Sequence, residues 1–160
     1  PANTLIEAPA MGIDWLPTLA ELTQSELPKL KIDGASLVSL LTRKTAKAPH
    51  QNFFFYYRTN ELHAVRHKNW KLYLPHTYRT LNGRVGSNDG LPIAYEQCEI
   101  KTPTLFNLIN DPEENLNVAE QYPEMVDKIA KIADSIRYVL GDQLNGIKGN
   151  EVRPVGKISQ

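Results

Sequence analysis

The chain has 160 residues, of which 41% are hydrophobic, and its 18 basic and 18 acidic side chains give a formal net charge of +0. This length and apolar content suffice for one ordinary domain with a buried core, and the balanced charge predicts neither nucleic acid nor a membrane as a partner. No apolar run approaches the roughly 18 residues that span a bilayer, and the single Cys98 excludes an internal disulfide. Since the chain begins with Pro1 rather than Met, we expect a processed or truncated product.

Two short helices are predicted before residue 49. Asp14 can cap the first, and Pro17 falls in its first turn, where the missing N–H does little harm. The apolar stripe of this helix consists of Trp15, Leu16, Leu19 and Leu22. After a turn at Asp33-Gly34, Leu37, Leu40 and Leu41 are spaced for a second helix that ends in the polar stretch 42–47. Both apolar faces need a partner surface to cover them.

The hydrophobic period changes to two over residues 52–74, which predicts three strands. Aromatic residues alternate in the first strand, and a polar corner at His67-Lys68-Asn69 separates the other two. A fourth strand is predicted at Thr104 to Leu108, directly before Asp111-Pro112. The intervening stretch 75–102 has weak periodicity and is predicted to be a long loop.

The strongest helical pattern runs from Pro123 to Leu140, and Gly141 is placed to end it. We expect its apolar face to lie on the sheet, and the polar tail 142–160 to lack regular structure. The predicted fold class is therefore α/β in the α+β sense. It has a roughly four-stranded antiparallel sheet packed by one long C-terminal helix and preceded by two short helices.

Five segments, each weak alone, are specific in their combined order. They are Ile13 to Leu19, Ile32 to Leu37, Phe54-Phe55-Tyr56-Tyr57, the hairpin Leu62 to Tyr73, and Leu105 to Ala119. In this order they resemble the C-terminal portion of the sulfatase family, the hydrolases of sulfate esters related to arylsulfatase A. The ending Gly146 to Pro154 is similar to that of bacterial members. The resemblance assigns residues 1–48 to the edge of the catalytic domain and residues 49–160 to the C-terminal subdomain.

The resemblance implies a parent enzyme that hydrolyses aryl or carbohydrate sulfate esters. Its family uses calcium and a formylglycine, made from Cys or Ser in a Cys/Ser-x-Pro-x-Arg motif. Cys98 is followed by Glu99-Ile100-Lys101-Thr102, which does not fit the motif, and no Ser fits it either. We therefore expect no catalytic or metal-binding residue in this chain, no activity from it alone, and the N-terminal catalytic domain of the same protein as its partner. Bacterial members are usually exported, which implies a periplasmic or secreted location.

His76, Tyr78 and Arg79 are the candidate substrate-binding residues, because they directly follow the third predicted strand. Arg and His offer charge-assisted hydrogen-bond donors to sulfate or sugar hydroxyls, and a Tyr ring can stack on a sugar face. The string Pro-His-x-Tyr-Arg resembles a position that lines the outer part of the substrate pocket in some arylsulfatase A-like enzymes. A solvated loop without a ligand role explains the same residues.

Other polar residues have simpler explanations. Lys71 is expected to face solvent on its strand. His50, His63 and His67 are too scattered for a metal site and are predicted at the surface or in turns. The oxygen-rich run 110–115 lacks the spacing of an EF-hand, and is predicted to form a turn.

A second hypothesis is a stand-alone, non-catalytic module that binds sulfated glycans. Its basis is a set of interleaved basic and aromatic residues: Arg58, Arg66, Arg79 and Arg84 with Tyr56, Tyr57, Trp70 and Tyr78. Strand aromatics are more often core, however, and the resemblance places Phe55, Trp70 and Leu72 beneath the C-terminal helix. A third hypothesis, compatible with the enzyme, is a structural segment that completes the catalytic domain and shapes access to it.

Overall fold

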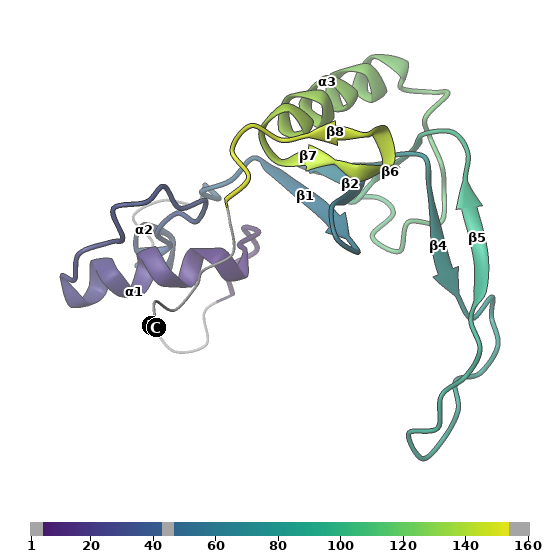
Figure 1. Cartoon of the computed structure of the whole chain (residues 1–160), viewed down its shortest axis with the longest axis horizontal. Helices are drawn as coiled ribbons and strands as arrows, with labels where there is room; N and C mark the ends of the chain where they lie inside the picture. Colours follow the sequence, from purple (N-terminus) through teal and green to yellow (C-terminus); the bar gives the residue numbers. More distant parts are fainter. Residues whose placement is uncertain (1–4, 43–46, 154–160) are drawn as a thin grey trace. The chain divides into compact units, whose positions relative to one another are not determined.

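The computed structural model describes residues 5–42 and 47–153, and the chain forms two compact units, Pro1–Gln51 and Asn52–Gln160 (Figure 1). The first unit contains a 3₁₀ turn, η1 (Gly12–Asp14), and helices α1 (Trp15–Thr23) and α2 (Val38–Leu41). Both predicted short helices are therefore present, although α2 is little more than one turn. Residues 43–46, part of the polar stretch expected after α2, lie outside the described residues.

Asp14 connects the segments of the first unit, and its side chain is fully buried. Its Oδ2 accepts a hydrogen bond from the backbone N–H of Met11 at 2.8 Å. Its Oδ1 accepts one from the N–H of Ala35 at 2.9 Å and lies 2.6 Å from Nε2 of His50. Asp14 occupies the N-cap position of α1 but makes no side-chain capping hydrogen bond. The predicted cap of α1 is thus wrong in its contacts, because this carboxylate binds the nearby N–H of Met11, which starts η1, and the distant N–H of Ala35 instead.

The apolar stripe predicted on α1 is exposed. Its members have exposed fractions above one half: Trp15 56%, Leu16 52%, Leu19 53% and Leu22 59%. The buried residues of α1 are instead Pro17, Thr18 and Ala20. The large apolar side chains therefore remain available to a partner surface, as the sequence indicated.

The second unit is built on a four-stranded antiparallel sheet with the strand order β1-β2-β3-β6. Its strands are β1 (Asn52–Tyr57), β2 (Glu61–His67), β3 (Trp70–Tyr73) and β6 (Thr104–Asn107). Helix α3 (Pro123–Leu140) begins at the predicted proline and packs on one face of the sheet (Figure 1). The predicted fold class is confirmed.

One row of side chains across the sheet meets α3. In register, this row is Phe54, Val65, Leu72 and Leu105. The last three are fully buried, as are Ile129 and Ala133 of α3, which pack against them. Burying one such Val, Leu or Ile side chain contributes about 1.5–3 kcal/mol, so this layer is the main source of cohesion in the unit.

Phe55 lies on the other face of the sheet and is 43% exposed. The prediction that it packs beneath the helix is therefore wrong, whereas Leu72 is in the core and Trp70 packs partly against it. Aromatic residues occupy every position of β1 from Phe53 to Tyr57. The period of two alone does not say which alternate set faces the helix.

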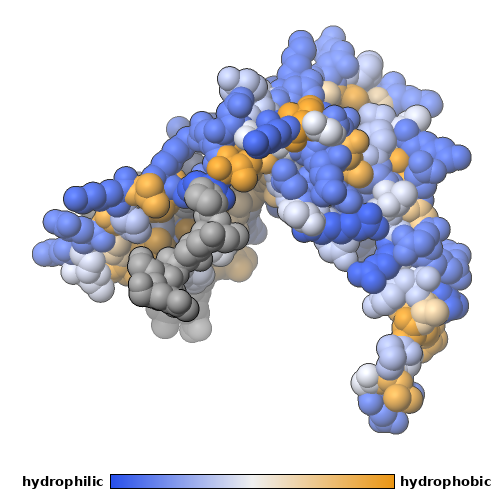
Figure 2. Space-filling view, in the orientation of Figure 1, coloured by the Kyte–Doolittle hydropathy of each residue, from blue (hydrophilic) through white to orange (hydrophobic). Residues whose placement is uncertain are grey.

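A two-stranded antiparallel ribbon replaces much of the predicted loop. It consists of β4 (His76–Thr80) and β5 (Glu96–Ile100), with Tyr78 opposite Cys98. Most of its side chains are exposed, so the apolar alternation that identifies a half-buried strand is missing. The connection between the two strands exposes Val85 and Leu91, and Figure 2 shows apolar surface at this end of the ribbon.

The chain after α3 is also regular. Gly141 ends the helix as predicted, with φ 83°, and is followed by β7 (Gly141–Asp142), η2 (Gln143–Asn145) and β8 (Ile147–Lys148). Strands β7 and β8 pair antiparallel. The predicted irregular tail is therefore wrong over 142–148, because Asp142 is buried and forms a 2.8 Å ion pair with Nε of Arg137. Residues 154–160 lie outside the described residues.

Candidate functional site

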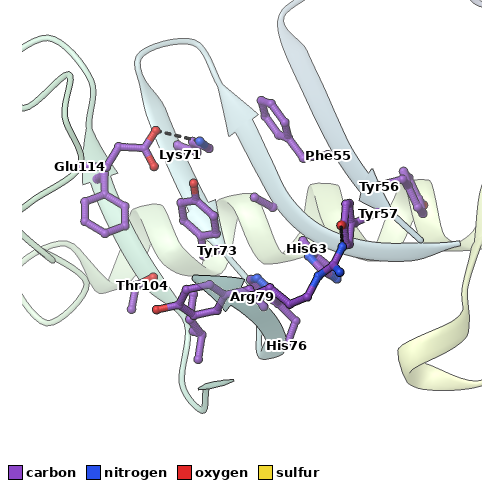
Figure 3. A pocket seen from close by; sticks show the side chains of 14 residues that line it. Phe55, Tyr56, Tyr57, His63, Lys71, Tyr73, His76, Arg79, Thr104 and Glu114 are labelled. Carbon is purple, nitrogen blue, oxygen red and sulfur yellow. Dashed lines mark hydrogen bonds and ion pairs between the residues drawn. The ribbon is translucent and has the colours of Figure 1, made fainter. Parts of the chain in front are cut away.

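A pocket of about 730 Å³ opens on the sheet face that α3 leaves uncovered (Figure 3). Its floor is the row next to the core row, which in register is Phe55, Ala64, Tyr73 and Thr104. Ala64 is the smallest side chain of this row and is almost fully buried. The floor is therefore hollowed between the rings of Phe55 and Tyr73, while residues of β4 and of the turn after β6 form further walls.

Lys71 lies in the wall of this pocket, and the prediction that it faces solvent is wrong. Its Nζ is 2.7 Å from Oε1 of Glu114, and the lysine side chain is only 15% exposed. The same nitrogen lies 4.9 Å from the ring centroid of Phe55 and 4.7 Å from that of Tyr73. Burial lowers the pKa of Lys71, but hydrogen bonds with Glu114 and Tyr73 outweigh burial and raise this pKa above its ordinary value. Lys71 is thus a cation held between two aromatic rings.

Glu114 reaches the pocket from the turn that follows β6. Asp111 shapes this turn, since its Oδ1 accepts from the N–H of Asn115 at 3.0 Å and its Oδ2 from the N–H of Leu116 at 2.8 Å. These two hydrogen bonds hold the pKa of Asp111 below its ordinary value. The predicted turn is present, and it also delivers the carboxylate that pairs with Lys71.

Two histidines stack in the pocket where β2 meets the start of β4. The ring centroids of His63 and His76 are 3.9 Å apart, and their planes are inclined by 26°. Nε2 of His63 lies 3.0 Å from Oε2 of Glu61, and Nδ1 of His76 lies 2.6 Å from the carbonyl oxygen of Leu74. Burial lowers the pKa of His76 below its ordinary value of 6.5. Both rings are buried, so the predicted surface position of His63 is wrong.

The other two histidines lie outside the pocket. His50 pairs with Asp14 in the first unit. His67 is buried near the end of β2, where its Nδ1 lies 2.7 Å from Oδ1 of Asn52. His67 directly precedes the predicted turn, where it pairs with Trp70 across Lys68-Asn69, but its ring is buried and does not lie at the surface.

Arg79 extends towards β1 in Figure 3, where its Nη2 donates a hydrogen bond to the hydroxyl of Tyr57 at 3.1 Å. This hydrogen bond raises the pKa of Arg79. The ring of Tyr78 is partly exposed and lies 6.0 Å from that of His76. The structure thus brings all three predicted site residues, His76, Tyr78 and Arg79, to one pocket.

Sequence reasoning missed four polar side chains of the same pocket: His63, Lys71, Tyr73 and Glu114. For Lys71 and Tyr73 the signal was the strand alternation, because each is next to Leu72 of the core. Using that signal requires knowing which face the helix covers. His63 had no such signal: it lies two positions before Val65 of the core, and only the register shift between β1 and β2 turns it away from the helix. Glu114 had no comparable signal, since a turn residue has no fixed face.

Within residues 5–42 and 47–153, no cluster of three or more His, Cys, Asp or Glu side chains is arranged to hold a metal ion. Calcium, which the resemblance implies for the family, therefore fits no site in this part of the chain. Cys98 lies partly exposed on β5 outside the required motif, so a formylglycine does not fit there. No helix in the described ranges is both long and apolar enough to cross a membrane.

Comparison with protein families identifies a match for most of the chain. The family described as the C-terminal region of aryl-sulfatase matches residues 48–154. Arylsulfatase A of Bos taurus is 30% identical over 120 residues, which cover 72% of this chain and 23% of that protein. Arylsulfatase D of Homo sapiens is 33% identical over 124 residues, covering 71% and 21% respectively. The chain spans about a quarter of the length of these relatives or less.

Two solved structures share the fold. One, from Bacteroides thetaiotaomicron and described under the metabolism of multiple glycosaminoglycans, has a TM-score of 0.55 and 23% identity over 78% of this chain and 24% of that one. The other, in complex with its substrate D-glucosamine-2-N,6-O-disulfate, has a TM-score of 0.51 and 19% identity, over 86% and 25%. At these identities the likeness shows the fold alone.

Proposed function

The chain belongs to the sulfatase family, as the C-terminal region of an aryl-sulfatase, and we propose that it forms the outer wall of the substrate pocket in a protein that hydrolyses sulfate esters. The family match over residues 48–154 is the observation that carries this proposal. The pocket on the uncovered sheet face supports it, because a concave aromatic surface with a few polar groups suits a small ligand. In this proposal residues 1–48 form the edge of the catalytic domain and residues 49–160 the C-terminal subdomain.

His76, Tyr78 and Arg79 are the proposed substrate contacts. Arg79 is exposed and charged, and its guanidinium has donors beyond the one bound to Tyr57. The half-exposed ring of Tyr78 offers a stacking surface for a sugar or an aryl group. Phe55 extends that apolar surface along the floor.

The groups that break the ester belong, in this proposal, to the N-terminal catalytic domain of the same protein. Sulfatases supply there a formylglycine nucleophile and calcium, and the described residues of this chain fit neither. This chain therefore binds and orients a sulfated small molecule or carbohydrate, and completes the wall that excludes water. We also expect the whole protein to be exported, as bacterial members of the family usually are.

The alternative of a stand-alone module that binds sulfated glycans is not favoured. Such a module needs basic side chains free to meet sulfate groups. Arg58 pairs with Glu61 at 3.2 Å, and Arg84 donates to the carbonyl oxygen of Ala94 at 2.8 Å. Arg79 lines a pocket rather than an open basic surface.

The test uses the full-length protein and simple sulfate esters, 4-nitrophenyl sulfate and a monosaccharide sulfate. We expect the protein to hydrolyse at least one of these esters. In an Arg79→Met variant, KM should be about tenfold higher and kcat should change by less than about twofold, because a binding contact is lost while the ester-breaking groups remain. Arg84→Met is the matched control, since Arg84 lies beyond the same strand and does not line the pocket. Equal effects of the two variants would exclude Arg79 as a contact, and hydrolysis of neither ester would overturn the proposed activity.

A further inference from the structure

The stacked histidines of the pocket point to a more specific role for His76, which rests on the proposed function. We infer that His76 is a neutral hydrogen-bond acceptor, positioned by His63, that recognises a hydroxyl group of the substrate rather than its sulfate. This differs from the expectation of a charged histidine donating to sulfate.

The backbone determines the tautomer of His76. Nδ1 lies 2.6 Å from the carbonyl oxygen of Leu74, and a carbonyl can only accept, so Nδ1 carries the proton and donates it. In the neutral ring Nε2 is then an acceptor. Nε2 makes no hydrogen bond to any described residue. It is also not fully buried, since the one buried side-chain nitrogen or oxygen without a partner among the described residues is Nε2 of His67. Its lone pair is therefore open to the pocket that His76 lines.

His63 opposes a second proton on His76. The two rings stack with centroids 3.9 Å apart, so two imidazolium charges would repel each other strongly at this depth. Glu61 lies 3.0 Å from His63, so its carboxylate contacts the other ring of the pair and not His76. Burial lowers the pKa of His76, and the charge on His63 lowers it further. The hydrogen bond to Leu74 and the charge of Glu61 raise this pKa but do not outweigh the first two effects.

The remaining groups around His76 do not reverse this balance. From β3 and β4 the rings of Tyr73 and Tyr78 lie 6.1 Å and 6.0 Å away, and phenols are neutral near pH 7. From β1, the ring centroid of Tyr57 lies 5.5 Å from that of His63, and the Tyr57 hydroxyl accepts a hydrogen bond from Arg79. Arg79 thus adds a positive charge to this part of the pocket. Ile100, the partner of His76 on β5, is apolar. The negative charge of Glu61 is already shared between His63 and Arg58.

A neutral acceptor discriminates between parts of a sulfated ligand. Sulfate oxygens only accept, so they gain nothing from Nε2, whereas an alcohol O–H can donate to it. A substrate without that hydroxyl would leave Nε2 desolvated and unpaired, which costs far more than the bond itself contributes. Arg79, which is exposed and has donors beyond the one bound to Tyr57, remains in the pocket as the donor for anionic groups.

The first experiment compares two esters on the full-length protein: N-acetylglucosamine 6-sulfate, whose ring carries hydroxyls, and 4-nitrophenyl sulfate, which has none. We expect His76→Phe to lower kcat/KM for the sugar ester by about 10- to 100-fold, mainly through KM, and for the aryl ester by less than about threefold. His67→Phe is the matched control, since His67 is buried on the same sheet outside the pocket, and it should leave the ratio of the two esters unchanged. Equal losses on both esters in His76→Phe would overturn the inference.

The positioning role of His63 has its own measurement, the pH dependence of KM for the sugar ester. In the parent protein KM should begin to rise only below the ordinary histidine value of 6.5, because the pKa of His76 is lowered. His63→Phe keeps the ring buried but removes the opposing charge and frees Glu61, so KM should begin to rise at a higher pH than in the parent. Identical pH profiles would reduce His63 to a packing residue.

The protonation state of His76 can also be read without turnover. NMR of the full-length protein labelled with ¹⁵N-histidine, with the His76 signal assigned by its loss in His76→Phe, should show a neutral ring protonated on Nδ1 at about pH 6.5. A cationic ring, or a proton on Nε2, would overturn the inference even if the protein hydrolyses both esters. If the protein hydrolyses neither ester, the proposed function is overturned, and with it the substrate role of His76. The NMR spectrum would still decide whether the ring is a neutral acceptor.

Discussion

Replacing Asp142 by Asn tests how the chain after α3 is held to the sheet. The carboxylate is fully buried and receives four donors. They are Nε of Arg137 at 2.8 Å and Nδ2 of Asn145 at 2.7 Å on Oδ2, and the N–H groups of Leu62 at 3.3 Å and Leu144 at 3.1 Å on Oδ1. Because donors meet both oxygens, either orientation of the Asn amide places its NH₂ against existing donors, and the charge opposite Arg137 is lost.

The expected cost follows from this burial. Removing one partner of a buried ion pair destabilises a protein by about 3–5 kcal/mol. With an m-value of about 2 kcal/mol per M for a unit of roughly 100 residues, the urea midpoint should fall by about 2 M. The assay is Trp70 fluorescence in a Trp15→Phe background, since the chain has only these two tryptophans and Trp70 packs against the core of the second unit.

Asp134→Asn is the matched control, because it pairs with the same Arg137 at 2.9 Å but its side chain is 71% exposed. An exposed pair contributes about 0–1 kcal/mol, so its midpoint should move by less than about 0.5 M. Equal shifts in the two variants would refute the reasoning.

The effect of Asp142→Asn should also depend on pH. Burial acts to raise the pKa of Asp142, but the hydrogen bonds from Arg137, Asn145 and the backbone outweigh it and hold this pKa below its ordinary value of 3.8. The charge therefore contributes stability that is fully present above pH 3.8 and is lost as pH falls through the folded pKa. The gap between parent and variant should narrow below pH 3.8.

Two further predictions concern the stripe on α1 and the glycine after α3. We expect the isolated chain to be poorly stable or to self-associate through its exposed apolar stripe, and Leu19→Glu to reduce association in sedimentation equilibrium; a sharp, concentration-independent thermal transition of a monomer would count against this. Gly141→Ala should cost about 3 kcal/mol or more in urea unfolding, because φ is 83° and the new Cβ would lie 2.7 Å from the carbonyl oxygen of Ile147. Gly146→Ala has φ 65° with no atom within 4 Å and should cost about 1 kcal/mol, so equal losses would contradict the steric argument.

Regular apolar patterns explain which elements could be predicted. Helix α3 and strands β1, β3 and β6 each turn one apolar face to the core, and their periods of 3.6 or two are visible in the sequence. Strand β2 is buried at nearly every position, and its core residues Leu62 and Val65 are three positions apart. The β4–β5 ribbon buries little of either face, so it has no such pattern. Strand β7 depends on contacts of Asp142 with Leu62, a residue 80 positions away, which no local pattern reveals.

The candidate site, like the fold, could be predicted from the sequence only in part. His76, Tyr78 and Arg79 could be proposed because they follow a recognisable strand, and the structure places all three in one pocket. Their contact with substrate stays a prediction. Lys71 was given an ordinary role because a strand pattern with aromatic residues on both faces does not identify the open face. His63 was missed because the register shift between β1 and β2 breaks the alternation at that position.

The sequence by itself determined the sulfatase family, the positions of the four sheet strands along the chain and the long helix, because ordered motifs and apolar periods are local properties of the chain. Only the tertiary structure decided which sheet face is open. Packing of α3 on the row that contains Leu72 leaves the next row, which contains Tyr73, to form the pocket floor. On this open face Glu114 meets Lys71 and His63 stacks on His76. Each pair joins residues from different segments of the chain, so no local pattern predicts either contact. A period of two is the same for both faces of a strand, and only packing distinguishes them.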